Sequence, residues 1–131
     1  WIAEQLVLSL VKNGNNIKAS KLLIMGLTFK ENCPDFRNSK VFNLIEYLNN
    51  YGFIIDVVDP FINEYIELKN MNFVPKKSIP ECTKYEAIIL AVGHKLFTEL
   101  SIEAWKSIQS PKCIIFDVKG IVPKELNPIR I

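Results

Sequence analysis

Two kinds of hydrophobic pattern alternate along this chain, and together they predict strands and helices in turn. Short runs that are apolar throughout, with several β-branched residues, are typical of strands covered on both faces. Stripes with apolar residues at i, i+3, i+4 and i+7 are typical of helices that pack one face on a sheet. The predicted strands cover residues 22–25, 53–58, 87–92 and 113–116, the last being the final strand, and the predicted helices cover residues 2–13, 39–51 and a short segment from about Ser101.

The stretch between residues 61 and 80 carries weaker patterns. Residues 61–70 place several apolar side chains on roughly one face, which predicts a further helix. Residues 72–75 are predicted to form a short strand at the edge of the sheet.

Strands that alternate with helices imply parallel pairing, and right-handed crossovers then restrict the topology to a doubly wound sheet. The predicted fold class is therefore α/β, a Rossmann-like doubly wound parallel sheet of about five strands. Numbered along the chain, with residues 72–75 as the third strand, the strands are expected in the order 3-2-1-4-5. The sequence contains no internal repeat, low-complexity segment or linker, so we expect one domain.

Composition and charge narrow the class of protein. With 131 residues, 49% of them hydrophobic, the chain is long enough to bury a core without disulfides or a structural metal. Its three cysteines are widely spaced and form no CxxC pair, so we expect reduced thiols and no metal site. A net charge of +2 favours neither nucleic acid nor an anionic membrane as partner.

The sequence also bears on where the protein works. No apolar run reaches the roughly 20 residues that span a bilayer. Glu4 and Gln5 interrupt the first apolar segment, where a signal peptide would be apolar without a break. We therefore expect a cytoplasmic protein.

The candidate chemistry is concentrated at the carboxyl ends of the predicted strands. In open α/β sheets ligands bind beyond those ends, where the chain begins to build the other side of the sheet. Residues 27–38, 93–97 and 117–120 leave the strands there, and the first of these segments leads into a helix N-terminus that suits an anion. The donors and titratable groups in these segments include Thr28, Lys30, Asn32, Arg37, Asn38, Ser39, His94, Lys95 and Lys119.

The turn after the first strand differs from a standard dinucleotide site. Gly26 is followed by Leu27, Thr28 and Phe29, whereas the NAD fingerprint needs further glycines so that pyrophosphate can approach the backbone. Side-chain cations would have to replace that backbone. A diphosphate held by Lys and Arg is one such arrangement.

Four segments of this sequence resemble a known family. They read GLTFKENCPDFRNSKV, VVDP, LAVGHKLF and DVKGI. They are similar to the C-terminal, UDP-binding domain of the UDP-glucose/GDP-mannose dehydrogenase family, and most of all to its bacterial UDP-N-acetylhexosamine 6-dehydrogenases. The resemblance covers nearly the whole chain. It implies that residues 1–14 are the end of a connecting helix from a central domain and that residues 15–131 form a UDP-sugar-binding domain.

The resemblance implies four substrate-binding residues. Phe29 and Lys30 match an FK pair that lines the UDP-sugar site in the family. Arg37 matches the arginine of a DxR motif, and Lys119 matches a basic position that approaches the diphosphate. His94 belongs to an HxxF motif of the N-acetylhexosamine branch, to which no role is assigned.

The resemblance also implies an activity for a longer protein. Family members oxidise the C6 alcohol of the sugar to a carboxylate with NAD, through intermediates on a cysteine that lies upstream of the segment represented here. Cys33 does not replace that cysteine, so we expect no catalytic residue in this chain, no NAD bound by it and no activity from it alone. The product would be a UDP-hexosaminuronic acid for capsule or O-antigen polysaccharide, and the partners would be the missing domains and further subunits in a homodimer or larger assembly.

Each candidate residue also has a simpler interpretation. Arg37 can pair locally with Asp35 or Glu31, and surface pairs of this kind are common and weak. Lysines such as Lys30 and Lys119 are more often solvated than functional. Phe29 can belong to the core, or it can form an apolar floor for a base or sugar.

Two titratable residues have simpler interpretations of the same kind. His94, the one histidine, is expected to be an exposed loop residue, and its titration near neutral pH does not by itself indicate catalysis. Cys33 is expected to be an unreactive thiol, because no base or helix N-terminus can be placed against it.

Two other functions compete with the family assignment. A phosphoacceptor receiver domain shares the fold and a lysine after the fifth strand, but Gly26, Leu27 and Thr28 occupy the place where it needs acidic residues. A free-standing NAD-binding module would use Asp59 on the ribose, but the glycine fingerprint is lacking. Titration with UDP and with NAD distinguishes the three possibilities.

Overall fold

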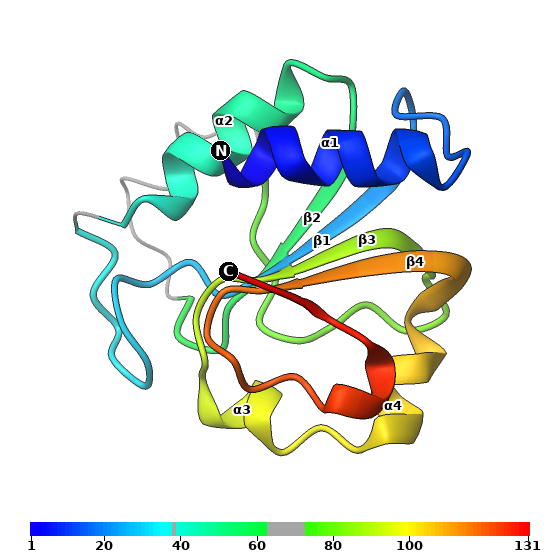
Figure 1. Cartoon of the computed structure of the whole chain (residues 1–131). Coiled ribbons are helices and arrows are strands. Elements are labelled where there is room, and N and C mark those ends of the chain that lie inside the picture. The colour runs from blue at the N-terminus through cyan, green and yellow to red at the C-terminus, as the bar shows by residue number, and fades with distance from the viewer. Residues whose placement is uncertain (38, 63–72) are drawn as a thin grey trace.

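The computed structural model describes residues 1–37, 39–62 and 73–131, which form a five-stranded parallel sheet between two layers of helices (Figure 1). The order of strands in the sheet is β2-β1-β3-β4-β5. The strands are β1 (Lys21–Met25), β2 (Ile54–Val58), β3 (Tyr85–Leu90), β4 (Gln109–Asp117) and β5 (Ile129–Arg130), and the helices are α1 (Ile2–Lys12), α2 (Val41–Asn49), α3 (Lys95–Thr98) and α4 (Ile102–Ser107).

One face of the sheet is covered by α1 and α2, and the other by α3 and α4 (Figure 1). Side chains alternate between faces along each strand, so Leu22 and Ile24 point towards α1 and α2, whereas Leu23 and Met25 point the other way. Both sets are fully buried, which explains why the β1 sequence is apolar at every position after Lys21.

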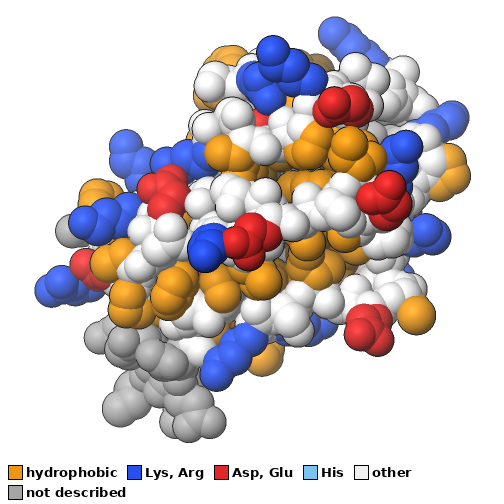
Figure 2. Space-filling model, turned by 90° about the horizontal axis from the view of Figure 1, so that it is seen from below, with side chains coloured by type: hydrophobic (Ala, Val, Ile, Leu, Met, Phe, Trp, Pro, Cys, Tyr) orange, Lys and Arg blue, Asp and Glu red, His pale blue; other side chains and the backbone are white. Residues whose placement is uncertain are grey.

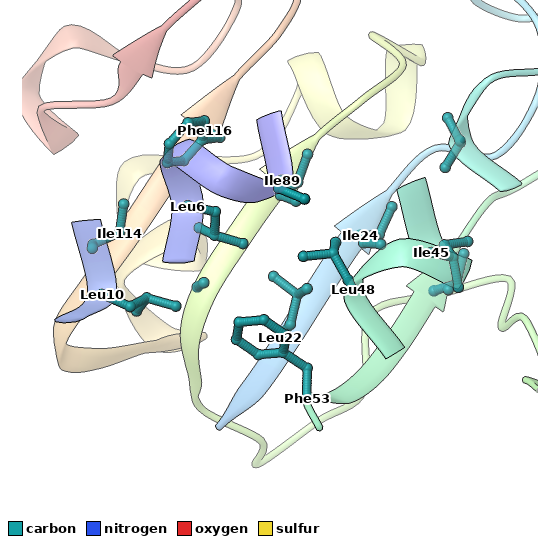
Figure 3. Close-up of a cluster of buried hydrophobic side chains, with 14 of the residues drawn as sticks. Leu6, Leu10, Leu22, Ile24, Ile45, Leu48, Phe53, Ile89, Ile114 and Phe116 are labelled. Atoms are coloured by element: carbon teal, nitrogen blue, oxygen red, sulfur yellow. The ribbon is translucent and has the colours of Figure 1, made fainter. Parts of the chain in front are cut away.

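The core under α1 and α2 is continuous across the sheet (Figure 3). The pairing of β1 with β3 sets Leu22 beside Ala87 and Ile24 beside Ile89. Leu6 and Leu10 of α1 are completely buried in the same cluster. The first helix is therefore part of the core of this domain.

The core on the opposite face is built around large aromatic side chains. Phe97 of α3 and Trp105 of α4 are each 1% exposed and pack with Tyr85 of β3. The short α4 begins at Ser101, whose hydroxyl accepts the N–H of Ala104 at 3.1 Å. On this side of the molecule, Lys and Arg side chains are interspersed with Asp, Glu and hydrophobic side chains (Figure 2).

The fold class predicted from the sequence is confirmed, and the order of the four strongly predicted strands is confirmed with it. The edge strand predicted at residues 72–75, the first of which lies outside the described residues, is not formed at 73–75; the structure has a single parallel bridge between Lys76 and Val58, at the expected edge beside β2. The strand at residues 113–116 is not the last, because β5 pairs with the end of β4. Most of the helix predicted at 61–70 lies outside the described residues.

Within the described ranges no helix combines the length and the apolar character needed to cross a bilayer.

Candidate functional site

The loop between β1 and α2 leaves the carboxyl edge of the sheet through a tight turn at Gly26. This residue has a φ of +101°, which favours glycine, and its N–H donates to the carbonyl of Val58 at 2.8 Å. A Cβ at this position would lie 2.5 Å from the Cβ of Val92. Gly26 therefore allows β1 and the end of β3 to approach each other where the loop begins.

A buried carboxylate at the end of β2 holds the first residues of this loop. Asp59 Oδ2 accepts the N–H groups of Leu27 at 2.7 Å and Thr28 at 3.0 Å, and Oδ1 accepts the N–H of Phe61 at 2.8 Å. The Asp59 side chain has no exposed surface. These bonds satisfy amide groups that the turn would otherwise leave unpaired in the interior.

His94 completes this buried network. Its Nε2 lies 2.9 Å from Asp59 Oδ2 and 2.9 Å from the hydroxyl of Thr28, while Nδ1 accepts the backbone N–H of Asn32 at 3.0 Å. Because Nδ1 accepts a hydrogen bond, the hydrogen-bond pattern assigns the proton to Nε2 and makes the ring neutral.

The expectation that His94 is an exposed loop residue is wrong. Its side chain is completely buried. The rings of Phe61 and Phe97 lie 5.0 and 5.8 Å from the imidazole, centroid to centroid, so apolar groups cover it while polar groups satisfy both nitrogens.

Burial raises the pKa of Asp59, but the hydrogen bonds from His94 and from the amides of Leu27 and Phe61 outweigh it. The pKa of this carboxyl therefore lies below its usual range, and the network contains a carboxylate.

A cleft of about 780 Å³ opens beside the loop, between the N-terminus of α1, the start of α2 and the carboxyl ends of β3 and β4. Phe29 lines it, with 56% of its surface exposed, and Lys119 reaches it from the segment after β4. These two residues, predicted to share a site, are thus brought together. The other side chains along the cleft are mainly apolar or neutral: Trp1, Ile2, Ala3, Thr28, Ser39, Val41, Asn43, Leu44, Tyr47, Ala91, Val92 and Val118, with Lys40 as the second cation.

Lys119 is positioned by a turn around Asp117. The buried carboxylate of Asp117 accepts the N–H groups of Gly120 at 2.8 Å and Val122 at 2.9 Å, and Arg130 Nε lies 3.5 Å from it. The turn directs the ammonium of Lys119 to within 3.3 Å of Glu31 Oε1.

Glu31 is the carboxylate that pairs with Lys119. A hydrogen bond from its own backbone amide lowers its pKa most, burial works in the opposite direction, and the contact with Lys119 lowers it further. Both side chains are about 40% exposed, at 41% and 38%, so water screens the pair.

Lys30 and Arg37, the other two predicted site residues, are not among the residues that line the cleft. The guanidinium of Arg37 is bidentate on Asp35, at 3.0 and 3.1 Å, and its side chain is 84% exposed. Arg37 is the first cause of the lowered pKa of Asp35, to which the charge of Lys30 also contributes. The simpler interpretation of Arg37 as a locally paired residue describes this structure.

Sequence patterns alone did not indicate that Asp59 and His94 would meet. Asp59 was considered only as a ribose ligand for NAD and His94 only as a titratable group in the segment 93–97, and no periodicity links positions 35 residues apart. The signal that could have linked these two residues is strand order. Asp59 follows β2 and His94 follows β3, and because these strands flank β1, both residues fall at the turn after Gly26.

The network also bears on the two competing functions. An NAD ribose would need the carboxylate of Asp59, but both of its oxygens are engaged by buried donors. Asp117, at the end of β4, is likewise engaged by the amides of its own turn. Neither carboxylate is available as a phosphoacceptor or a ribose ligand.

The cysteines and the metal-ligating residue types offer little further chemistry. Cys33, Cys82 and Cys113 are free, and burial, followed by the nearby charge of Glu86, raises the pKa of Cys113 to about 12. In the part of the chain that the structure describes, His, Cys, Asp and Glu side chains form no group of three or more suited to a metal ion.

Comparison with known proteins identifies similar sequences. Residues 23–124 match the family described as the UDP-glucose/GDP-mannose dehydrogenase family, UDP binding domain. The chain is 32% identical over 131 residues to UDP-N-acetyl-D-glucosamine 6-dehydrogenase of Salmonella typhi, covering 100% of this chain and 31% of that protein. It is 34% identical over 130 residues to Protein CapL of Staphylococcus aureus, covering 97% and 30% respectively. The chain therefore spans less than a third of these curated relatives.

Solved structures agree on the fold. An NDP-N-acetyl-D-galactosaminuronic acid dehydrogenase from Methanosarcina mazei superposes with a TM-score of 0.76 at 20% identity, over 91% of this chain and 24% of that one. A UDP-D-ManNAc dehydrogenase from Pyrococcus horikoshii gives 0.71 at 20% identity, over 98% and 29%. The family predicted from the sequence is confirmed. Because the match spans most of the chain, this protein belongs to the UDP-glucose/GDP-mannose dehydrogenase family, as its UDP-binding domain.

Proposed function

We propose that this chain binds the UDP portion of a UDP-N-acetylhexosamine in the cleft beside Phe29 and Lys119, as the C-terminal domain of a longer NAD-dependent 6-dehydrogenase. The observation that carries the proposal is the convergence of Phe29 and Lys119, ninety residues apart, on one cleft at the carboxyl edge of the sheet. Its volume of about 780 Å³ suits a nucleotide-sized ligand.

Each of the predicted residues has a place in this proposal. The exposed ring of Phe29 offers an apolar surface to the base or sugar, and the ammonium of Lys119 offers a charge-assisted hydrogen bond to the diphosphate. Binding would require the ammonium of Lys119 to leave the carboxylate of Glu31 and to contact a phosphate oxygen of the ligand instead. Lys30 and Arg37 lie on the same loop and would approach the ligand only by a rearrangement of their side chains.

The remaining functions belong to the longer protein. Other domains would bind NAD and supply the nucleophilic cysteine, so this chain alone would be inactive. Residues 1–14, besides packing on the sheet, would continue a helix from a central domain, and the subunits would assemble as dimers or larger. The product, a UDP-hexosaminuronic acid made in the cytoplasm, would serve capsule or O-antigen synthesis.

Titration calorimetry of the chain with UDP and with NAD tests the proposal. We expect measurable binding of UDP and none of NAD. Lys119→Ala should weaken UDP binding by about 1.5 to 3 kcal/mol, roughly ten- to a hundred-fold, because it removes a charge-assisted hydrogen bond. Lys84→Ala is the matched control, since Lys84 is also an exposed lysine with a side-chain partner, the carbonyl of Ser107 at 3.2 Å, but it precedes β3 at the opposite edge of the sheet and does not line the cleft.

Two results would overturn this assignment. One is tighter binding of NAD than of UDP. The other is an equal effect of Lys119→Ala and Lys84→Ala, which would mean that only the net charge of the domain matters. In the longer enzyme, Lys119→Ala should raise KM for the UDP-sugar and leave KM for NAD nearly unchanged.

A further inference from the structure

We propose that His94 is a positioning residue for the nucleotide, which holds the loop after β1 in the conformation that presents Phe29 to the cleft. The inference rests on the proposed function, because it concerns the affinity of the same cleft for UDP. It assigns a role to a buried, polar side chain that the family resemblance left without one.

His94 can act only through its neighbours. It has no exposed surface, so it cannot touch a ligand in the cleft. Its two nitrogens contact three residues: Asp59, which follows β2, and Thr28 and Asn32, which begin and end one short stretch of the loop after β1. The imidazole therefore ties residues 28 and 32 to the same rigid group.

Asn32 also contacts the residue that follows His94. Its side-chain Oδ1 accepts the N–H of Lys95, the residue after His94, at 2.9 Å. The pair of bonds between residues 32 and 94–95 forms a reciprocal clamp between the loop and the first turn of α3. Asn32 has a φ of +54°, a conformation that asparagine tolerates better than most residues.

The stretch between the two clamped positions includes Phe29, which lines the cleft, and Glu31, which pairs with Lys119. Thr28 and Phe29 line the cleft, and the N–H of Phe29 donates to the carbonyl of Asp35 at 2.7 Å. Glu31, which precedes Asn32, carries the carboxylate that pairs with Lys119. A shift of the clamp would therefore move both the ring of Phe29 and the charge that opposes the ammonium of Lys119.

The two nitrogens of His94 separate positioning from stability. Nε2 serves the completely buried Asp59 and the hydroxyl of Thr28, a residue whose backbone N–H Asp59 also holds, whereas Nδ1 serves the backbone of Asn32, an exposed residue. Asparagine at position 94 can offer an acceptor near the place of Nδ1, and glutamine can offer a donor near the place of Nε2. The substitutions His94→Asn and His94→Gln thus each retain a different half of the network.

The test measures the Kd for UDP by chemical-shift titration, alongside thermal unfolding of each variant. His94→Gln should raise Kd about three- to tenfold, the effect of losing about one hydrogen bond's contribution to positioning. His94→Asn should lower the melting temperature more than His94→Gln does, because it loses the bond to Asp59. At temperatures where His94→Asn is folded, its Kd for UDP should lie within about twofold of that of the unsubstituted chain.

A second substitution keeps the test decisive if the histidine variants do not fold. Asn32→Gly retains the positive φ and removes the acceptor for Lys95, and it should raise the Kd for UDP by about threefold. Asn127→Gly is the matched control, because Asn127 also has a positive φ, +50°, and lies away from the cleft. It should leave Kd unchanged.

The outcomes distinguish the two hypotheses. If the unsubstituted chain binds UDP and the folded variants at positions 94 and 32 bind it equally well, His94 has only a structural role and the proposed function stands. If the unsubstituted chain does not bind UDP, both the proposed function and the positioning role are wrong.

Discussion

The loop between β1 and α2 has two parts that are held in different ways. Its root, residues 27–32, is fixed by buried hydrogen bonds to Asp59 and His94, which lie more than 30 residues further along the chain. Its tip, residues 33–37 and 39–40, contains a local ion pair, Arg37 with Asp35, that is open to solvent. In Figure 1 this loop, in cyan, projects beyond the carboxyl ends of the strands.

The difference separates residues that the sequence had grouped together. Phe29 is in the root and lines the cleft, whereas Arg37 is in the tip and does not. Buried polar contacts strengthen one another in a medium of low dielectric constant, while exposed pairs contribute little. We therefore expect substitutions in the root to affect stability strongly and substitutions in the tip to affect it weakly.

The largest effect is expected from Asp59→Ala. It leaves the amides of Leu27, Thr28 and Phe61 and the ring of His94 without their acceptor in the interior. We expect a loss of about 3 to 5 kcal/mol in the free energy of unfolding, measured by urea denaturation. Asp35→Ala, the corresponding change in the tip, should leave the midpoint nearly unchanged. If Asp59→Ala and Asp35→Ala lower the free energy of unfolding by similar amounts, the root and the tip contribute equally to stability and the comparison is wrong.

The next largest effect is expected from Gly26→Ala, at the entrance to the root. The added Cβ would meet Val92 at 2.5 Å and would sit on a backbone with φ of +101°, so we expect a loss of about 2 to 4 kcal/mol. Gly120→Ala isolates the backbone contribution, because Gly120 has a φ of +74° but open space around it, and it should cost about 1 kcal/mol. Equal losses would mean that the close approach to Val92 contributes nothing.

The root should also make stability depend on pH. The pKa of Asp59 in the folded state lies below its ordinary value of about 3.8, so the unfolded chain takes up a proton first as the pH falls. Stability from this group is complete above that value and is lost as the pH falls through the folded pKa. Asp59→Asn should flatten the dependence of unfolding free energy on pH below about 4.

Asp35→Asn is the control for this pH dependence. The pKa of Asp35 is also lowered, chiefly by Arg37, but the pair is exposed and screened, so the slope should change little. If Asp35→Asn flattens the pH dependence of the unfolding free energy and Asp59→Asn does not, the assignment of this dependence to the buried carboxylate is wrong.

The smallest effect is expected from Arg37→Ala, read by the same denaturation and by UDP titration. Stability should stay close to that of the unsubstituted chain, because the ion pair is exposed. Kd for UDP should rise less than in Lys119→Ala, since Arg37 does not line the cleft. An equal rise in both variants would show that the tip closes over the ligand.

Much of the fold followed from the sequence because its signals are local. The apolar residues at 22–25 and 87–92 predicted inner strands, and the structure pairs β1 directly with β3, which ends at Leu90. Shorter elements escaped the same reasoning. The four residues of α3 and the two of β5 are too few for a hydrophobic period to be recognised.

The candidate site was predictable only in part. The position of Lys119 after the last long strand placed it at the correct edge of the sheet, and it does line the cleft with Phe29. The burial of His94 was not predictable, because a single polar residue after a glycine carries no sign of the Phe61 and Phe97 rings that cover it.

The sequence by itself determined the parallel sheet, its two apolar faces and the edge at which the polar segments emerge, since hydrophobic periodicity and strand order are properties of the chain. Only the tertiary structure decided which polar groups meet there: Asp59 with His94, and Lys119 with Glu31. These contacts join segments 35 and 88 residues apart, whereas the pair of Arg37 with Asp35 joins near neighbours. A long-range contact depends on how the turns aim each side chain and on which partner excludes water, and neither is encoded in a local pattern.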